Sequence, residues 1–352
     1  MKVTVHLPNG LPADQLAGVV EDLQRHFPDA RAFVGLDRDE DLLQRVHAAY
    51  PQADILVRFY HPDRMRESGE ARARQDIEWC HHHPWARHFV PANELNLQGE
   101  HPSAPGVAGG AWDNAAAYQL INLWLLDWAA EFRRLWNEHA MPGEPTLHWP
   151  ALSPQPDELA HLHLCAESLR AYDVIDLHHY GIADPLSGRV LRYKEHGARR
   201  LWVTEANGGK GADQLAFMRD FRVVRPLEAQ IEVAAWFIHD SADPAFDWCK
   251  LRGRPEELLW AQIAREAKDW LTTPTPQPPP GGNMLKDTYP DVYAGWLAEQ
   301  GGAEAVLANA FEDHGVGIGL RQPTISDFSR LADRAASVAA QLQNVARRFP
   351  KA

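Results

Sequence analysis

Two glutamates stand where apolar runs of the sequence end. One run reads HFVPANELN and closes on Asn93 and Glu94, and another reads LWVTEANGG and closes on Glu205. Paired carboxyl groups can break a glycosidic bond, because one protonates the leaving oxygen and later deprotonates water while the other attacks the anomeric carbon to form a glycosyl ester. The sequence therefore offers Glu94 as a general acid/base and Glu205 as a nucleophile.

Other polar and aromatic residues end further apolar runs. The segment DLHHYG puts His178 and Tyr180 on one face of a strand, because side chains along a strand alternate with a period of two. Arg58, in the run VRFYH, would keep Glu205 ionised if it lies nearby, while the second carboxyl group holds its proton. The segment AWFIHD contributes Trp236.

These residues need a scaffold that brings distant strand ends together. Short β-rich runs alternate with longer amphipathic stretches, which is typical of a parallel sheet wrapped by helices. The predicted strands are residues 3–7, 32–36, 54–60, 88–95, 146–152, 174–180, 201–206 and 233–239. The predicted helices are residues 14–26, 40–49, 72–80, 115–139, 157–170, 211–223 and 256–271, with a short segment around 191–196. Eight such units favour an α/β fold, the closed (β/α)8 TIM barrel, whose active sites lie at the C-terminal ends of the strands.

The pattern resembles clan A, or the 4/7 superfamily, of retaining glycoside hydrolases. Its members are TIM barrels in which an Asn-Glu pair ends strand four and a Glu ends strand seven. The resemblance covers residues 1–271. It implies that Glu94 is the acid/base, that Glu205 is the nucleophile, and that Asn93 hydrogen-bonds the sugar 2-hydroxyl.

The same resemblance assigns roles to residues of strands six and eight. It implies that His178 and Tyr180 lie beside the catalytic carboxylates, with the Tyr180 hydroxyl bonding the nucleophile. It also implies that Trp236 forms the floor of the subsite where the bond breaks.

The chain departs from the superfamily pattern at three points. Leu95 follows Glu94 where many members have proline, and Ala206 follows Glu205 where an aromatic residue or glycine is frequent. Arg58 ends strand three, one strand later than the superfamily's arginine. These departures leave open the individual family, the sugar, the linkage, and endo or exo action.

A proline-rich segment divides the chain. Residues 272–282 read TTPTPQPPPGG, and repeated proline forbids helix and sheet and favours an extended spacer. Residues 283–352 after it are predicted to form a small helical domain whose apolar stripe needs a partner. We expect this region to dock on the barrel or on another subunit, because about 70 residues rarely bury enough surface alone.

Composition limits the possible partners. The 352 residues carry a net charge of −13, which argues against nucleic-acid binding by phosphate neutralisation. Thirteen tryptophans suit a carbohydrate substrate, an oligosaccharide or polysaccharide. No apolar run approaches the roughly 20 residues needed to span a membrane, and no signal peptide is visible, which favours the cytoplasm without deciding the location. Neither a metal nor another cofactor is predicted, because the three cysteines lack metal-type spacing.

Two other functions stay open on the sequence. The barrel could be a non-catalytic glycan-binding or assembly module, with the helical tail as its attachment point. It could also be a metal-dependent hydrolase that uses His178 and His179. At the level of residues, Glu94 and Glu205 could be structural carboxylates held in salt bridges, and Trp236 could fill the barrel.

Overall fold

The computed structural model describes most of the predicted barrel, namely residues 1–61, 63–97, 115–154, 158–181, 186–211, 213–224 and 231–267. The predicted linker at 272–282 and the predicted helical domain at 283–352 lie outside the described residues. Within the described part of the chain, no helix combines the length and the apolar character needed to cross a membrane.

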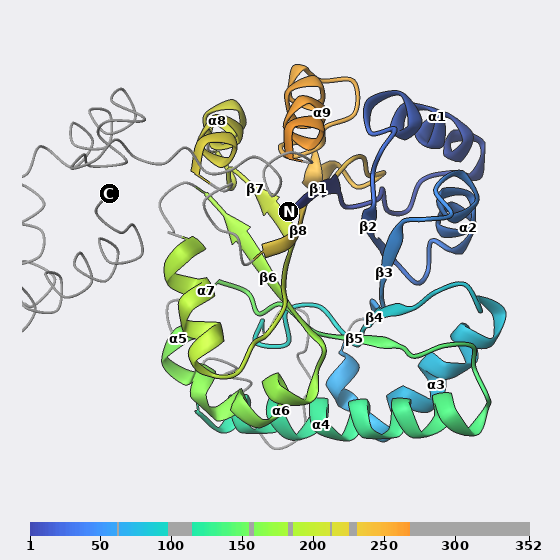
Figure 1. The fold of residues 1–352 in the computed structure, drawn as a ribbon, viewed down its shortest axis with the longest axis vertical. Helices are drawn as coiled ribbons and strands as arrows, with labels where there is room; N and C mark the ends of the chain where they lie inside the picture. The colour runs from blue at the N-terminus through green and yellow to red at the C-terminus, as the bar shows by residue number, and fades with distance from the viewer. Residues whose placement is uncertain are drawn as a thin grey trace, which may run out of the picture. The chain divides into compact units, whose positions relative to one another are not determined.

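Eight parallel strands form the centre of the fold (Figure 1), and the prediction of a TIM barrel is confirmed. The strands are β1 (Lys2–Val5), β2 (Ala32–Leu36), β3 (Asp54–Arg58), β4 (His88–Val90), β5 (Thr146–Trp149), β6 (Val174–Tyr180), β7 (Leu201–Asn207) and β8 (Ile231–Trp236). Neighbours in the sheet follow the chain from β2 to β8, and β8 then pairs with β1. The ring closes where a single bridge joins His6 to Val34 and the Leu7 amide donates to the Val34 carbonyl at 2.7 Å.

Helices surround the strands on all sides of the ring in Figure 1. They are α1 (Leu16–His26), α2 (Glu40–Ala49), α3 (Gly69–His82), α4 (Ala115–Glu138), α5 (Glu158–His161), α6 (Ala166–Ala171), α7 (Leu186–Glu195), α8 (Gln214–Val224) and α9 (Pro255–Ala267). Short 3₁₀ helices cover Ala13–Gln15, Arg64–Arg66, Leu162–Cys165 and Pro244–Phe246.

The helix predicted at 157–170 is interrupted. In the structure α5 and α6 are separated by a 3₁₀ turn. The Ser168 amide donates to the Asn122 side chain at 2.9 Å, and the Ser168 hydroxyl donates to the Cys165 carbonyl at 3.0 Å. Side-chain bonds of this kind compete with the helical pattern, which explains the break.

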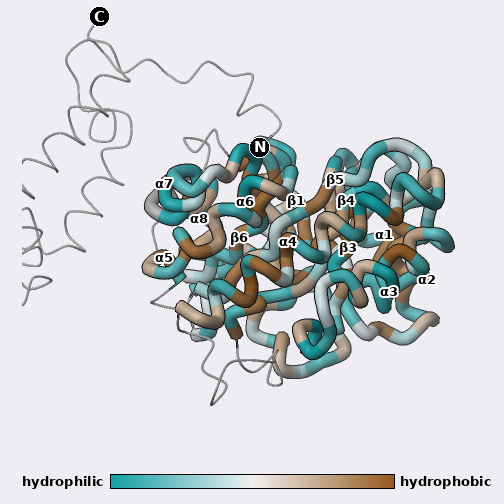
Figure 2. Tube along the Cα trace, turned by 90° about the horizontal axis from the view of Figure 1, so that it is seen from below, coloured by the Kyte–Doolittle hydropathy of each residue, from teal (hydrophilic) through white to brown (hydrophobic). Residues whose placement is uncertain are grey.

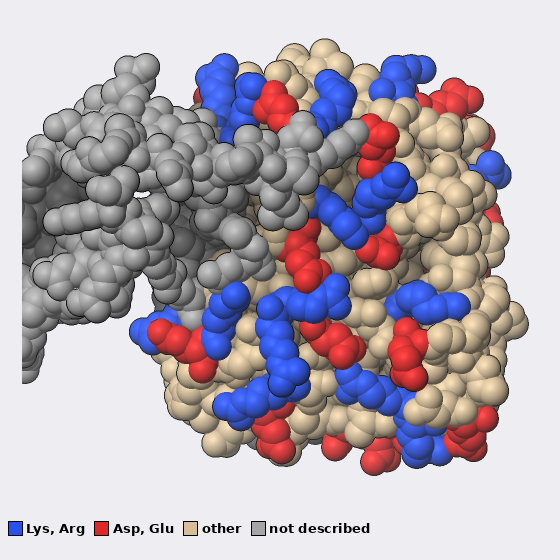
Figure 3. All heavy atoms as spheres, viewed as in Figure 1, with Lys and Arg blue, Asp and Glu red and all other residues tan. Residues whose placement is uncertain are grey.

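The core has two layers. Inward-facing strand residues fill the barrel, and they include Ala32, Val34, Leu56, Val90, Val174, Trp202, Val233 and Ala235. The opposite strand faces pack against the inner sides of the helices in a larger apolar layer. Figure 2 shows hydrophobic positions concentrated inside and hydrophilic positions along the outer turns, and on the face seen in Figure 3 acidic and basic side chains are interspersed.

Candidate active site

Two carboxylates meet at one imidazole ring. His178, the fifth residue of β6, lies with Nδ1 2.6 Å from Glu94 Oε1 and with Nε2 3.4 Å from Glu205 Oε1. All three side chains are buried, and that of His178 is completely so. The structure therefore brings the two predicted carboxylates together around a shared side chain.

Each oxygen of Glu205 has its own donor. The Arg58 guanidinium donates to Oε1, and the Tyr180 hydroxyl donates to Oε2. Arg58 also lies 3.4 Å from Thr204 Oγ1 and 3.4 Å from His178 Nε2. Charge-assisted bonds on both oxygens fix the orientation of the carboxylate and favour its ionised form.

A bulge in β7 turns Glu205 into the barrel. Val203 pairs with Leu177, but His178 pairs with Glu205, so one extra residue, Thr204, is inserted between them. Trp202 faces inward, so strict alternation would send Glu205 outward. A β-bulge re-aims side chains in this way and is common beside active sites.

Glu94 sits in an uncommon backbone conformation just after β4. Its φ is +31°, in a region that residues other than glycine seldom occupy. Its carbonyl accepts a bond from the Leu97 amide at 2.8 Å, and Leu95, which stands where the superfamily often has proline, is buried in the outer apolar layer. Strained residues of this kind cluster at functional sites, where the surrounding structure holds them in place.

The surroundings keep Glu205 charged. Burial raises the pKa of Glu205, but electrostatic interactions with His178, Arg58 and His6 and the bond from Tyr180 together lower that pKa to about 2. Burial, followed by the negative charge of Glu205, raises the pKa of Tyr180 well above its usual value, so Tyr180 stays a neutral donor. Glu205 is therefore a carboxylate throughout the physiological pH range.

Trp236 does not lie with these residues, which corrects the expectation that it forms the floor of the subsite. Its indole is fully buried outside the barrel, stacks in tilted geometry 5.1 Å from Trp260 of α9, and donates to the Cys249 carbonyl at 2.9 Å. Since Ala235 faces inward, its neighbour must face outward. Asn93, by contrast, directly precedes Glu94 and is partly exposed.

Two residues near the carboxylates were missed by the sequence analysis. Phe237 follows β8 on the inward side, partly exposed, and its ring meets the His6 ring edge to face at 5.2 Å. Burial, followed by the charge of Arg58, lowers the pKa of His6 to about 4, so His6 is neutral at pH 7. The period of two from Ala235 and from Thr4 is the signal that could have identified both residues.

The two histidines of the metal-hydrolase hypothesis point in opposite directions. His178 faces the carboxylates, whereas His179 lies on the other face of β6, 5.6 Å from the ring of Phe217. Neighbouring residues of a strand cannot converge on one ion. Within the described residues there is also no group of three or more histidine, cysteine or acidic side chains arranged to hold a metal.

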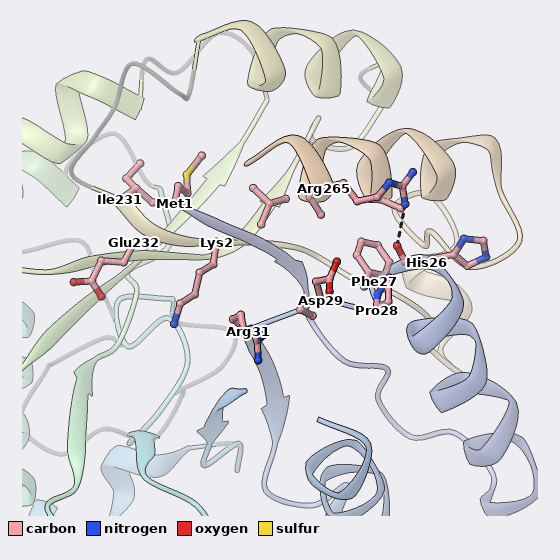
Figure 4. A pocket seen from close by; sticks show the side chains of 14 residues that line it. Met1, Lys2, His26, Phe27, Pro28, Asp29, Arg31, Ile231, Glu232 and Arg265 are labelled. Atoms are coloured by element: carbon pink, nitrogen blue, oxygen red, sulfur yellow. Dashed lines mark hydrogen bonds between the residues drawn. The ribbon is translucent and has the colours of Figure 1, made fainter. Parts of the chain in front are cut away.

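A separate pocket lies at the opposite end of the barrel (Figure 4). It has a volume of about 420 Å³ and is lined by the starts of β1 and β8, the turn from α1 to β2 and one side of α9. In Figure 4 Met1, Phe27 and Ile231 form apolar walls, and Arg265 reaches the His26 carbonyl at 3.4 Å. The pocket is distinct from the carboxylate cluster, because neither Glu94 nor Glu205 lines it. This end of a TIM barrel usually serves stability.

Comparisons with known proteins identify similar folds. No protein-family model matches the chain, and no curated protein matches it. The β-glycosidase from Pyrococcus horikoshii is 12% identical with a TM-score of 0.46, covering 72% of this chain and 85% of that chain. A broad-specificity endoglucanase from Clostridium longisporum is 9% identical with a TM-score of 0.49, covering 74% and 87%.

A third solved structure, the endo-β-1,4-glucanase from Xanthomonas axonopodis pv. citri, is 12% identical with a TM-score of 0.47, covering 76% of this chain and 99% of that chain. The chain is a TIM barrel by its own strand order. The three solved structures named above, to which it is similar, are a β-glycosidase and two endoglucanases.

Proposed function

We propose that the chain is a retaining glycosidase. Glu94 protonates the glycosidic oxygen while Glu205 attacks the anomeric carbon, which gives a glycosyl ester on Glu205. Glu94 then takes a proton from water, and the water hydrolyses the ester with overall retention of configuration. The single observation that carries the proposal is the meeting of both carboxylates at His178.

The unequal surroundings of the two carboxylates support these roles. Glu205 accepts from a guanidinium and from a phenol, which suits a nucleophile that must stay ionised. Glu94 has a histidine as its neighbour and no arginine within the contacts of the described residues, which suits a group that exchanges its proton. The proposed substrate is a β-linked or otherwise equatorial glycan, with Asn93 at its 2-hydroxyl.

The stereochemical outcome is a sharp test of the mechanism. Retention needs carboxyl groups about 5 to 5.5 Å apart, whereas inversion leaves room for a water at about 6.5 to 9.5 Å. The imidazole of His178 lies between Glu94 and Glu205 and contacts both carboxylates. The anomeric configuration of the first product therefore decides between retention and inversion. We expect proton NMR of a reacting mixture to detect the same anomeric configuration in the first product as in the substrate.

Amide substitutions test the assignment of the carboxylates. We expect Glu205→Gln to lower kcat/KM on the best substrate of an aryl-glycoside and polysaccharide panel by at least about 10³-fold, because attack on the anomeric carbon is lost. Glu94→Gln should leave kcat/KM nearly unchanged for aryl glycosides whose leaving group needs no protonation. Glu257→Gln is a matched control, since Glu257 is also buried and also pairs with a histidine, His239 at 3.0 Å.

Wild-type activity that survives Glu205→Gln would refute the proposed nucleophile. Binding of an oligosaccharide without turnover by the wild-type protein would instead favour the non-catalytic glycan-binding module. Azide adds a further check, because a small anion that replaces a missing nucleophile gives an inverted glycosyl azide, whereas one that acts in an acid/base variant gives a retained product.

A further inference from the structure

A chain of polar side chains crosses the interior of the barrel. Asp176 Oδ1 lies 2.8 Å from His148 Nδ1, His148 Nε2 lies 3.0 Å from His88 Nδ1, and His88 Nε2 lies 3.5 Å from Asp54 Oδ1. These four residues come from four consecutive strands, β6, β5, β4 and β3. TIM-barrel interiors are usually filled by branched apolar side chains, so this chain replaces packing that would stabilise the fold at less cost.

This row of side chains runs from Asp176, two residues before His178 on β6, to solvent at the other end of the barrel. Asp176 and His148 are completely buried, His88 has 12% of its side chain exposed, and Asp54 has 40%. The Trp202 ring stacks on His88 at 5.3 Å and meets His148 edge to face at 4.7 Å. The indole thus covers both imidazoles, and the direct contacts between the side chains provide a path for protons.

Two arrangements of hydrogens give each contact one proton while Asp54 remains a carboxylate and His148, whose pKa is lowered by burial, stays neutral. In the first, Asp176 is a neutral acid that donates to His148, His148 donates to His88, and His88 donates to Asp54. In the second, Asp176 is ionised, His148 donates to it, and His88 is an imidazolium beside Asp54. The two arrangements contain the same number of protons and differ only in where the charges lie.

Burial favours the first arrangement in the resting protein. It raises the pKa of Asp176 well above its usual value and lowers the pKa of His148 well below its own. In either arrangement, the bond from His88 is the main cause that lowers the pKa of Asp54. Within the described part of the chain, Asp176 Oδ2 has no hydrogen-bond partner, which also suits a neutral acid better than a carboxylate.

Charged and titratable groups of the surrounding strands shift the pKa values of Asp54, His148 and Asp176. They are Lys2 of β1, Arg58 of β3, Asp173 before β6, His178 of β6, Arg200 before β7, Glu205 of β7 and Glu232 of β8. Arg58 and Glu205 matter most for the proposal, because they form the ion pair of the candidate site. Arg58 favours the ionised form of Asp176, and the negative charge of Glu205 opposes it.

We propose that the side chains of Asp176, His148, His88 and Asp54 form a proton relay that replaces the charge of Glu205 when that carboxylate is neutralised. Ester formation on Glu205 leaves Arg58 without its anionic partner. The Asp176 proton then passes to His148 Nδ1, and the proton on His148 Nε2 passes to His88 Nδ1. Asp176 becomes a carboxylate near Arg58, His88 becomes an imidazolium beside Asp54, and the protons return when the ester is hydrolysed.

The role of Asp176 in catalysis rests on the proposed function, whereas the relay itself can be tested without turnover. Glu205→Gln imitates the neutralised carboxyl group. In full-length protein with ¹⁵N-labelled histidine, we expect this variant to raise the imidazolium population of His88 at pH 7 about tenfold, because a nearby negative charge has been removed. The His88 signal is assigned by its loss in His88→Gln.

Two matched variants make this experiment decisive. Asp176→Asn combined with Glu205→Gln should give the wild-type His88 spectrum, because an amide can donate to His148 but cannot release a proton. Glu94→Gln also replaces a buried carboxyl group at the same end of the barrel, and it should leave His88 as in the wild type. Equal His88 spectra in wild type and Glu205→Gln, or an equal change without Asp176, would overturn the relay.

A kinetic measurement tests the positioning role of Asp176. We expect Asp176→Asn to slow the burst that reports glycosyl-enzyme formation about tenfold and to leave binding of an unreactive sugar unchanged. Asp76→Asn is the control, since Asp76 is a buried aspartate paired with Arg64 outside the barrel interior. An unchanged burst in Asp176→Asn would refute the role, and a wild-type protein without glycosidase activity would refute the proposed function while the NMR result still decides the relay.

Discussion

At the scale of single residues, the site distinguishes its two carboxylates by their neighbours. Glu205 has a donor on each oxygen, whereas among the described residues the side-chain contact of Glu94 is with His178. The asymmetry comes from the types of the neighbouring residues, because an arginine and a tyrosine stabilise negative charge strongly and a histidine can also take up a proton. Proposed acid and nucleophile therefore differ before any substrate binds.

Removal of the Tyr180 hydroxyl should move the acid limb of the pH profile. The bond from Tyr180 helps to lower the pKa of Glu205, so Tyr180→Phe should raise that pKa and shift the acid limb of kcat/KM to higher pH by about 0.5 to 1 unit. Tyr172→Phe is the control, because the Tyr172 hydroxyl donates to the Leu125 carbonyl at 2.9 Å, on the outer side of the sheet. Coincident acid limbs in the two variants would contradict the role of Tyr180.

The residues of the site were predictable to different degrees. Glu94, Glu205, His178 and Tyr180 end strands whose apolar runs are plain in the sequence, and the structure brings them together. The family resemblance assigned the floor of the subsite to Trp236, and its neighbour Phe237 was not considered. Only the inward direction of Ala235 shows that Phe237 is the inward residue, because a shift of one position reverses the face of a strand.

At the scale of elements, strand number and order followed from the alternation of apolar runs. All eight predicted strands overlap the observed ones, and most end earlier than predicted, since the last residues of each run curve into the loops that carry the site. The bulge at Thr204 was not predictable, because nothing in the letters VTE reveals an extra residue. Glu205 was recognised because it closes the apolar run LWV, and the family resemblance then implied its role.

The packing of α3 on α4 depends on the absence of one side chain. A Cβ on Gly69 would lie 2.3 Å from the Trp124 carbonyl oxygen and 2.7 Å from the Trp128 amide nitrogen, both of them rigid backbone atoms. We expect Gly69→Ala to lower the free energy of unfolding by about 1 to 3 kcal/mol, measured by urea denaturation. Gly18→Ala in α1 is the control, because its Cβ meets only the end of the Arg252 side chain, at 3.1 Å, and it should be neutral or stabilising.

At the scale of the whole molecule, the depressed pKa of Glu205 links folding to pH. A carboxyl group whose pKa is lower in the folded than in the unfolded state stabilises the fold above its unfolded pKa, and that stabilisation is lost as pH falls through the folded pKa. Glu205 should contribute on the order of 3 kcal/mol at neutral pH, lost between about pH 5 and pH 2.

Glu205→Gln tests this linkage through the dependence of the free energy of unfolding on pH. The variant leaves Arg58 buried without its anionic partner, so we expect lower stability at pH 7 than in the wild type. Its free energy of unfolding should nevertheless fall less steeply from pH 5 to pH 2. If the free energies of unfolding of the two proteins fall in parallel with pH, the pKa of Glu205 is not strongly lowered in the folded protein.

The junction between β1 and β2 differs from the other seven. The other neighbours share ladders of two or more residue pairs, whereas β1 and β2 share only one backbone bridge, between His6 and Val34. A hydrogen bond from the Leu7 amide to the Val34 carbonyl and one from the Thr4 hydroxyl to the Ala32 carbonyl, at 2.5 Å, complete this junction. We expect local opening of the barrel to begin at the junction between β1 and β2, because local opening begins where the fewest hydrogen bonds must break. His6 belongs to this junction. Transient separation of β1 from β2 would therefore let water reach Glu94 and Glu205 from the side of β1.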